Sequence, residues 1–255
     1  MTDLPEELQL LQRTVRQFVE EKLRPHEREI EEREDIPRAL LGEIATMGFF
    51  GIGFPEESGG QGFGKLGYVV MVEQLARANA AIWNVVGGSV GLCATAISIG
   101  GDEAQKKRFL PDLLSGKKLG AYALSEPGAG SDAGSLRTRA RRDGDAYVLD
   151  GAKTFITNAP VADVFVVFAN VDPDAGSKGI TAFVVDGGTP GLRIGPNDRK
   201  MGLHGSTTAQ IFFEGMRVAA DGRLGAEGRG FPLALATLDH GRLGLAASSV
   251  GAAQR

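Results

Sequence analysis

The chain has 255 residues, of which 42% are hydrophobic and 24% charged, a composition that excludes disordered and fibrous proteins. Its net charge of −4 and pI near 5.5 argue against the basic face of a nucleic-acid-binding protein, so we expect no nucleic-acid partner. The single cysteine, Cys93, excludes an internal disulfide and a cysteine-based metal cluster. The histidines, His26, His204 and His240, lack metal-ligand spacing, so we expect no metal.

The apolar stretches and the N-terminal residues indicate where in the cell the protein is expected. We find no apolar stretch that reaches the ~20 residues needed to span a membrane. The first seven residues, MTDLPEE, are acidic, whereas a signal or transit peptide would be basic. The sequence therefore predicts a cytoplasmic protein without a membrane partner.

The N-terminal part has the pattern of helices. Asp3 and Glu6 resemble a capping box at a helix start, and Pro5 is tolerated in a first turn. A second helix is expected from Arg38 to about Gly48. The first helix is predicted by an apolar stripe on one face, made of Leu8, Leu11, Val15, Phe18 and Val19.

The next segment, from Lys65 to about Ile99, is rich in Ala, Val and Leu and contains small residues at Gly87, Gly88, Ser89 and Gly91. Such a segment is typical of a helix that is buried on most sides. A further helix is expected over 102–114, with Gly116 as its stop signal.

After Leu119 the hydrophobic period changes from 3.6 to 2, and Asp143-Gly144 has the signature of a hairpin turn. Helical composition returns from Phe231 and continues to Arg255. We therefore predict an α+β multidomain protein with a helical domain (1–118), a middle antiparallel β-barrel or sandwich (119–229) and the first helix of a C-terminal helical bundle (230–255). The expected strands are Tyr147–Leu149, Thr154–Ile156, Val164–Ala169, Ile180–Val185, Leu192–Ile194 and Ala209–Phe213.

Two glycine-rich stretches raise the question of a dinucleotide loop. ALSEPGAGSDAGS (123–135) follows an apolar run, but a hairpin comes next where a dinucleotide fold requires a helix. GFGKLG (62–67) matches G-x-G-x-x-G, but a loop precedes it where the motif requires a strand. Neither stretch therefore supports a dinucleotide-binding fold.

Five ordered segments resemble signatures of the acyl-CoA dehydrogenase family. Any one of them alone is a weak match, whereas five in order along one chain are specific. The five are YALSEPGAGSD (122–132), GAKTFIT (151–157), KMGLHGSTT (200–208), GRGF (228–231) and LDHGR (238–242).

This resemblance implies an oxidoreductase that removes the α-proton of an acyl-CoA thioester while the β-hydrogen leaves as hydride to flavin N5, which yields a trans-2-enoyl-CoA. It implies FAD as cofactor, electron-transfer flavoprotein as electron acceptor and a homo-oligomer, a dimer or a tetramer. The FAD contacts that it implies are Tyr122, Ala123, Leu124, Ser125, Glu126, Pro127, Gly128, Ala129, Gly130, Ser131, Phe155, Ile156 and Thr157.

The resemblance also implies contacts with the CoA substrate. Without the motifs, Ser125 and Thr157 are read as hydroxyls that satisfy their own strands, and Asp239 with Arg242 as a surface ion pair. Trp83, Val86 and Leu92 narrow the acyl pocket or belong to the ordinary core. The substrate contacts are Ser131, Asp239, His240, Gly241 and Arg242.

The catalytic base of this family is a glutamate, which most members supply from late in the C-terminal helical domain and a minority from the third position of D-x-x-R. Gly241 occupies that third position here, so we expect the base beyond Arg255 and no catalytic residue within the chain. The alternatives are an acyl-CoA oxidase or flavin monooxygenase of the same fold, and a non-catalytic flavin- and acyl-CoA-binding subunit. Oxygen reactivity of the reduced flavin separates the dehydrogenase from the first two.

Overall fold

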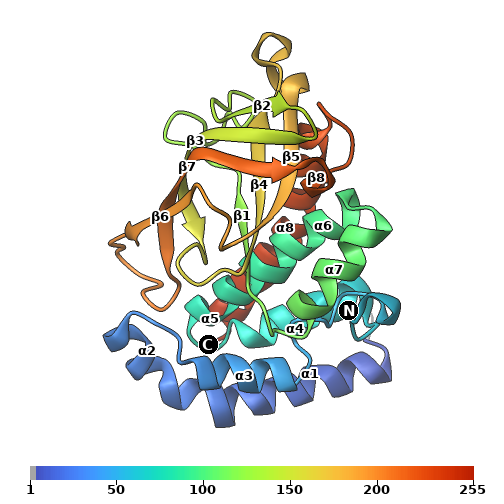
Figure 1. Cartoon of the computed structure of the whole chain (residues 1–255). Coiled ribbons are helices and arrows are strands. Elements are labelled where there is room, and N and C mark those ends of the chain that lie inside the picture. Colours follow the sequence, from blue (N-terminus) through green and yellow to red (C-terminus); the bar gives the residue numbers. More distant parts are fainter. Residues whose placement is uncertain (1–3) are drawn as a thin grey trace.

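The computed structural model describes residues 4–255 as a helical domain, a β-sheet domain and a long C-terminal helix (Figure 1). This order confirms the predicted fold class. The helices are α1 (Glu6–Phe18), α2 (Glu27–Arg33), α3 (Arg38–Thr46), α4 (Gly64–Leu75), α5 (Ala80–Val86), α6 (Thr95–Gly100), α7 (Glu103–Leu114) and α8 (Gly230–Ala253). The strands are β1 (Gly120–Ala123), β2 (Arg139–Asp143), β3 (Ala146–Thr157), β4 (Val164–Asn170), β5 (Ile180–Asp186), β6 (Leu192–Asn197), β7 (Thr208–Ala219) and β8 (Arg223–Leu224).

The first helix has the predicted amphipathic character. All five stripe residues of α1 and the turn after it are buried, while the intervening polar residues face outward. Pro5 is the residue that precedes the first helical turn, a position that needs no backbone N–H from it. Asp3, the proposed cap, lies outside the described residues.

The segment predicted as one buried helix over 65–99 contains two helices. The chain breaks after α4 because the side chain of Asn79 caps α5, accepting a hydrogen bond of 2.9 Å from the backbone N–H of Ala81. From there α5, a π-helical stretch (Gly87–Ala94, called η4) and α6 form one continuous helix.

This continuous helix, Ala80–Gly100, is 21 residues long and is apolar enough to cross a membrane by length and composition. The expectation that no stretch reaches that length was therefore wrong. Its most apolar window is 67% buried inside the fold, which is typical of a core helix. The small residues of η4 permit this burial: a Cβ at Gly91 would lie 2.6 Å from the hydroxyl oxygen of Tyr68, and Ser89 Oγ accepts the backbone N–H of Gly120 at 2.9 Å.

The strands form one sheet in the order β6-β7-β3-β2-β4-β5-β8, with β1 paired to β4. The hairpin expected at Asp143-Gly144 joins β2 and β3 as predicted. Two strands run longer than their apolar runs: β3 unites both runs that the sequence placed in separate strands, and β7 extends to Ala219. The pairing is mostly antiparallel, but β4 pairs in parallel with β1 and, at one residue pair, with β2.

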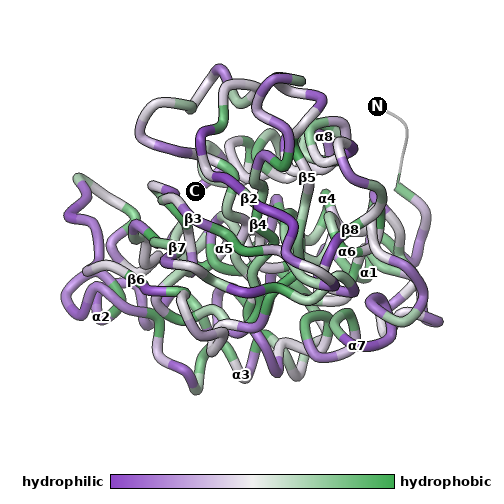
Figure 2. Tube along the Cα trace, turned by 45° about the horizontal axis from the view of Figure 1, so that its top comes forward, coloured by the Kyte–Doolittle hydropathy of each residue, from purple (hydrophilic) through white to green (hydrophobic). Residues whose placement is uncertain are grey.

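Strand β4 separates two apolar cores because its alternate side chains point to opposite faces. Val166 and Phe168 join the helical core, whereas Phe165 and Val167 join a core enclosed by the strands. Hydrophobic segments accordingly concentrate at the centre of the molecule and hydrophilic ones on the outer loops (Figure 2). The helical domain and the β domain therefore meet at this strand.

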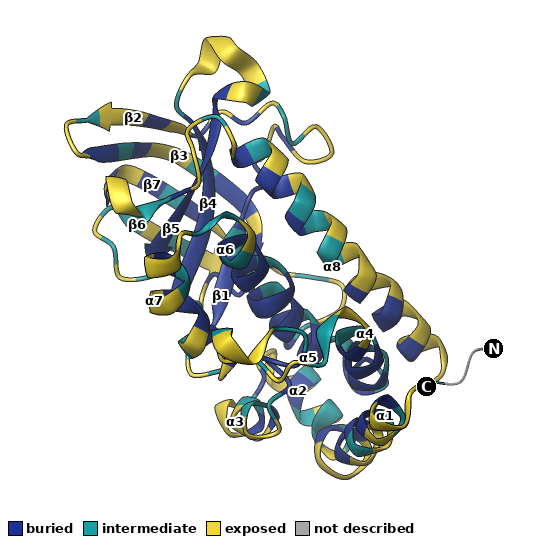
Figure 3. Ribbon diagram, turned by 90° about the vertical axis from the view of Figure 1, so that its right-hand side faces the viewer, coloured by how far each residue is buried: buried dark blue, intermediate teal, exposed yellow. Residues whose placement is uncertain are grey.

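The C-terminal helix α8 packs along α4, α6 and η4. One face is buried, and the other is exposed along its whole length (Figure 3). The exposed face is nevertheless partly apolar, so α8 presents hydrophobic surface to the outside of the described chain. Its exposed large apolar residues are Leu235, Leu243, Leu245 and Val250.

Candidate active site

A buried ion pair anchors the glycine-rich turn that follows β1. Lys153 on β3 donates hydrogen bonds to Glu126 Oε1 at 2.8 Å and to the carbonyl oxygen of Leu124 at 3.1 Å. The two charged side chains are only 0% and 6% exposed. Glu126 also accepts the backbone N–H groups of Arg137 at 2.7 Å and Thr138 at 3.0 Å. One carboxylate therefore fastens both ends of the turn to the sheet.

The pKa values of the pair reflect burial and mutual attraction. Burial lowers the pKa of the Lys153 ammonium to about 8, although the carboxylate of Glu126 opposes the shift. Burial raises the pKa of Glu126, but the charge of Lys153 and the hydrogen bonds outweigh it and hold that pKa below its usual range. Glu126 is thus ionised and saturated with hydrogen bonds, so it acts as an anchor. Lys153 was missed as a site residue, although it is the lysine of the GAKTFIT segment.

The end of β3 presents an aromatic ring in an unusual backbone conformation. Phe155 is 73% exposed and has a φ of 57°, in the left-handed region that an aromatic residue rarely occupies. Ile156, in contrast, is buried in the core between the strands. Asn158 holds this end of the strand in place, because its side-chain amide donates to the carbonyl oxygens of Val85 at 2.9 Å and Gly120 at 3.0 Å.

The glycine-rich turn exposes part of its backbone. At Gly128 and Gly130 a Cβ atom would meet no atom of the chain within 4 Å, and neither residue has a positive φ. Packing among the described residues therefore does not require glycine at these positions. Close approach of a ligand to the backbone would require it, because a side chain there would stand in the way. Pro127 and Ser131 are also exposed, and Ser125 is half-buried.

The remaining members of the segment have side chains that are buried or half-buried. Ala123, Leu124 and Ala129 are buried. The hydroxyl of Tyr122 donates to the carbonyl oxygen of Ala234 at 3.3 Å, which links β1 to α8. Burial raises the pKa of Tyr122, so its phenol stays neutral.

A cavity of about 240 Å³ lies between η4, the end of β3 and α8. It brings together Thr157, predicted for the cofactor, with Gly241 and Arg242, predicted for the substrate. The rest of its wall is mainly apolar and includes Trp83 and Leu92. Among the residues of 4–255 that line it, none is acidic. The chain thus builds an apolar slot whose only charged lining group is a guanidinium.

The other predicted substrate residues lie outside this slot. Asp239 pairs with Arg242 at 2.6 Å on the exposed side of α8. His240 lines a second cavity, and its Nδ1 lies 3.4 Å from the carbonyl oxygen of Ala236. Ser131 is exposed on the turn. Val86, considered for narrowing the pocket, is fully buried and does not line the slot.

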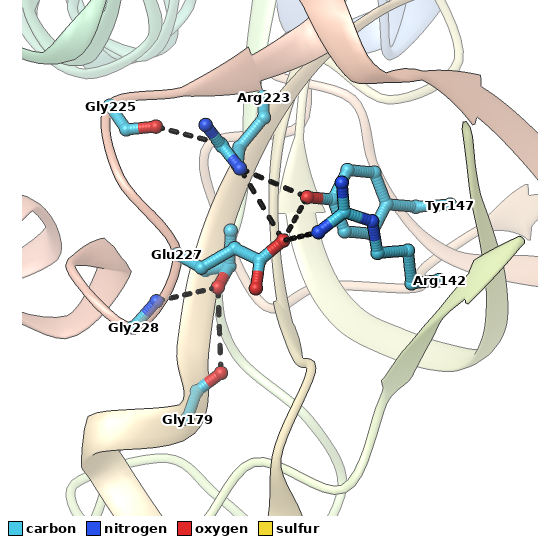
Figure 4. Close-up of polar contacts among 8 residues, drawn as sticks. Arg142, Tyr147, Gly179, Arg223, Gly225, Glu227 and Gly228 are labelled. Atoms are coloured by element: carbon cyan, nitrogen blue, oxygen red, sulfur yellow. Dashed lines mark hydrogen bonds and ion pairs between the residues drawn. The ribbon is translucent and has the colours of Figure 1, made fainter. Parts of the chain in front are cut away.

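A polar junction fixes the point where α8 begins (Figure 4). Glu227 accepts a hydrogen bond from the hydroxyl of Tyr147 and lies 3.4 Å from Arg223 and 3.7 Å from Arg142. Arg223 also donates to the Tyr147 hydroxyl at 3.0 Å. The junction joins β2, β3 and β8 to the segment before α8, so it orients the helix that carries Gly241. No sequence motif indicated it.

A second charged contact ties the KMGLHGSTT loop to the helical domain. His204 Nδ1 lies 2.6 Å from Glu31 Oε2, and its Nε2 lies 3.0 Å from the carbonyl oxygen of Lys200. These hydrogen bonds raise the pKa of His204 above its usual value of 6.5. The protonated imidazolium is therefore the form that the folded loop favours.

This contact makes stability depend on pH. Because the folded-state pKa is raised, the contact stabilises the fold below the unfolded pKa of His204, and that contribution is lost as pH rises through the folded pKa. We expect this contribution to the Tm to be lost as the pH rises above 6.5, the usual pKa of histidine, and through the raised pKa of His204. His204→Gln, which cannot titrate, should show a smaller fall over the same range. Equal falls in the two proteins would contradict this role of His204.

Known proteins share this arrangement of domains. The acyl-CoA dehydrogenase N-terminal domain model matches residues 5–117, and the acyl-CoA dehydrogenase middle domain model matches residues 121–216. The short-chain-specific acyl-CoA dehydrogenase of Clostridium acetobutylicum is 41% identical over 252 residues, which are 99% of this chain and 66% of that protein. Subunit CarC of the caffeyl-CoA reductase–Etf complex of Acetobacterium woodii is 40% identical, over 98% of this chain and 66% of that protein.

A solved structure agrees with these matches. Butyryl-CoA dehydrogenase from Megasphaera elsdenii superposes with a TM-score of 0.94 at 40% identity, and the match covers 98% of this chain and 67% of that one. The fold and these matches therefore define a protein of the acyl-CoA dehydrogenase type, with a helical domain followed by a β domain. The chain belongs to the acyl-CoA dehydrogenase family. It spans just under two thirds of the length of the curated relatives named above.

Proposed function

We propose that the protein formed by this chain is an FAD-dependent acyl-CoA dehydrogenase, which converts an acyl-CoA thioester to a trans-2-enoyl-CoA. The observation that carries the proposal is the slot that joins Thr157 of the β domain to Gly241 and Arg242 of α8. A mainly apolar slot of this kind suits an acyl chain and keeps water from the reacting carbons. The names of the short-chain and butyryl-CoA relatives support a short acyl group.

The residues beside the slot fit FAD. Phe155 offers an exposed aromatic face, and Gly128 and Gly130 offer backbone that a ligand can approach closely. The hydroxyls of Ser125 and Thr157 supply hydrogen bonds to the polar edge of the flavin ring in this proposal. Ala123, Leu124, Ala129 and Ile156 have buried side chains, so they contribute through the main chain. FAD, when bound, supplies the hydride acceptor.

The substrate is held by charge at one end and apolar contact at the other. Arg242, oriented by Asp239, lies where it can bind the anionic CoA portion. Trp83 and Leu92 enclose the acyl portion. The base that takes the α-proton comes from a residue outside the described chain, because the slot residues of 4–255 include no carboxylate.

The relatives support an electron acceptor for this protein, and the exposed face of α8 supports a homo-oligomer. The Etf-complex membership of the relative CarC supports electron-transfer flavoprotein as the electron acceptor. The exposed apolar residues of α8 support burial of that helix in a homo-oligomer, a dimer or a tetramer. We place the protein in the cytoplasm.

Spectroscopy tests the proposed function. The purified chain should bind FAD, and butyryl-CoA should then perturb the absorption spectrum of the bound flavin. After chemical reduction, slow reoxidation by oxygen in the presence of butyryl-CoA fits a dehydrogenase, whereas rapid reoxidation favours an oxidase or a monooxygenase. A chain that retains neither FAD nor acyl-CoA would refute the proposal.

Arg242 provides a second test. Arg242→Ala removes the one charged group among the described residues that line the slot, so we expect weaker binding of butyryl-CoA, by about tenfold, from the loss of a charge-assisted contact. FAD affinity should change little. Titration of butyryl-CoA and of FAD against both proteins measures the difference, with Asp239→Asn as a variant that keeps the guanidinium. Equal losses for both ligands in Arg242→Ala would show that Arg242 is structural.

A further inference from the structure

Tyr68 on α4 separates two cavities. Its side chain lines both the slot of about 240 Å³ and a second cavity of about 150 Å³. Within the described chain, Tyr68 is the one residue that lines both. The second cavity has a largely apolar floor that includes Val90, Thr95 and Ile99.

The position of the ring is fixed by close packing. Tyr68 packs edge-to-face against Trp83, with ring centroids 5.9 Å apart. Its hydroxyl oxygen sits between Gly91 on η4 and Gly244 on α8, where an added Cβ would lie 2.6 Å and 2.7 Å away. Only glycine at both positions leaves room for a phenol between the two helices.

The hydroxyl of Tyr68 contributes to this packing by its size and makes no hydrogen bond among the described residues. It is buried, and within residues 4–255 no hydrogen-bond partner reaches it. A buried hydroxyl without a partner is a cost to stability, so the ring and its bulk account for the packing at this point. Burial raises the pKa of Tyr68, which keeps the phenol neutral and compatible with an apolar slot.

We propose that Tyr68 sets the acyl chain length by closing the far end of the slot, so that the protein selects short acyl groups. The inference rests on the proposed acyl-CoA function. With the phenol in place, a chain that enters past Thr157 meets the Tyr68–Trp83 pair at the end of the 240 Å³ slot. Without the phenol, the slot continues into the 150 Å³ cavity beyond it.

The experiment compares the binding of butyryl-CoA and octanoyl-CoA to the FAD-loaded protein by calorimetry. Tyr68→Ala should shift the ratio of the two dissociation constants toward octanoyl-CoA by at least about tenfold, because each newly buried methylene contributes close to fourfold. Tyr68→Leu, which leaves a smaller void, should shift the ratio in the same direction by less. Tyr68→Phe is the matched control, since it removes only the unpartnered hydroxyl and should keep the wild-type ratio.

The outcomes separate this inference from the proposed function. Suppose that the wild-type protein binds butyryl-CoA but the ratio of the two dissociation constants is unchanged in both Tyr68→Leu and a folded Tyr68→Ala. This result overturns the role of Tyr68 and leaves the proposed function standing. A shift in Tyr68→Phe as large as in Tyr68→Ala also overturns it, because the ring would then not be the determinant. Wild-type protein that binds neither ligand refutes the proposed function itself and this inference with it.

Discussion

Lys153→Met is expected to destabilise the protein by about 3–5 kcal/mol, because it leaves the carboxylate of Glu126 buried without its countercharge. The side chains of this pair are 0% and 6% exposed, so water cannot replace the lost ammonium without local unfolding. The free energy of unfolding from urea titration measures the effect. FAD retention should fall as well, since the pair holds the glycine-rich turn against β3.

The double variant Lys153→Met/Glu126→Gln is the matched control. It removes both charges, so it should be less destabilised than Lys153→Met alone, and the difference reports the unpaired carboxylate. Gln at 126 keeps one carbonyl oxygen, so it can accept the backbone N–H of Arg137 or of Thr138 but not both, because these two groups bond different oxygens of Glu126. A single variant within about 1 kcal/mol of wild type, or a double variant as unstable as the single, would contradict the anchoring role.

Local signals in the sequence predicted much of the fold. The stripe of α1, the helix expected over 102–114 and the Asp143-Gly144 turn each depend on contacts within a few residues, and each appears in the structure. The exposed glycine-rich turn lies in the YALSEPGAGSD segment, and Phe155, with its left-handed backbone, lies in the GAKTFIT segment. Both segments were assigned to the site because they resemble signatures of the acyl-CoA dehydrogenase family. That part of the prediction depended on matching motifs.

The remainder depends on residues far apart in the chain. The parallel pairing of β1 with β4 and the anchoring of Glu126 by Lys153 both arise from tertiary packing, which periodicity does not encode. The side chain of Asn79 caps the start of α5 and so separates this helix from α4. The apolar residues around Asn79 obscured this capping signal in the sequence. Tyr68 gains its place only when η4 and α8 come together around it.

The second large effect concerns the α-proton. The purified 255-residue chain, loaded with FAD, should oxidise acyl-CoA at well below about 1 per second, because the slot residues within 4–255 offer no carboxylate. Glu126 cannot serve, since Lys153 and two backbone N–H groups occupy its oxygens. Asp239 pairs with Arg242 and does not line the slot. Steady-state turnover with an artificial electron acceptor measures the rate, and a rate typical of enzymes would contradict the absence of a base.

Gly241→Glu should supply the missing group. Position 241 lines the slot, and a Cβ there would lie 2.9 Å from Leu92 Cδ2, the end of a flexible side chain that can move aside. Since a well-placed general base contributes about 10²–10⁴-fold, we expect turnover of butyryl-CoA to rise by at least about a hundredfold. Gly241→Gln has the same size without the carboxylate and should stay at the wild-type rate. If Gly241→Glu binds FAD and butyryl-CoA as wild type does and yet is no faster than Gly241→Gln, then position 241 does not face the α-carbon, and the proposed orientation of substrate in the slot is wrong.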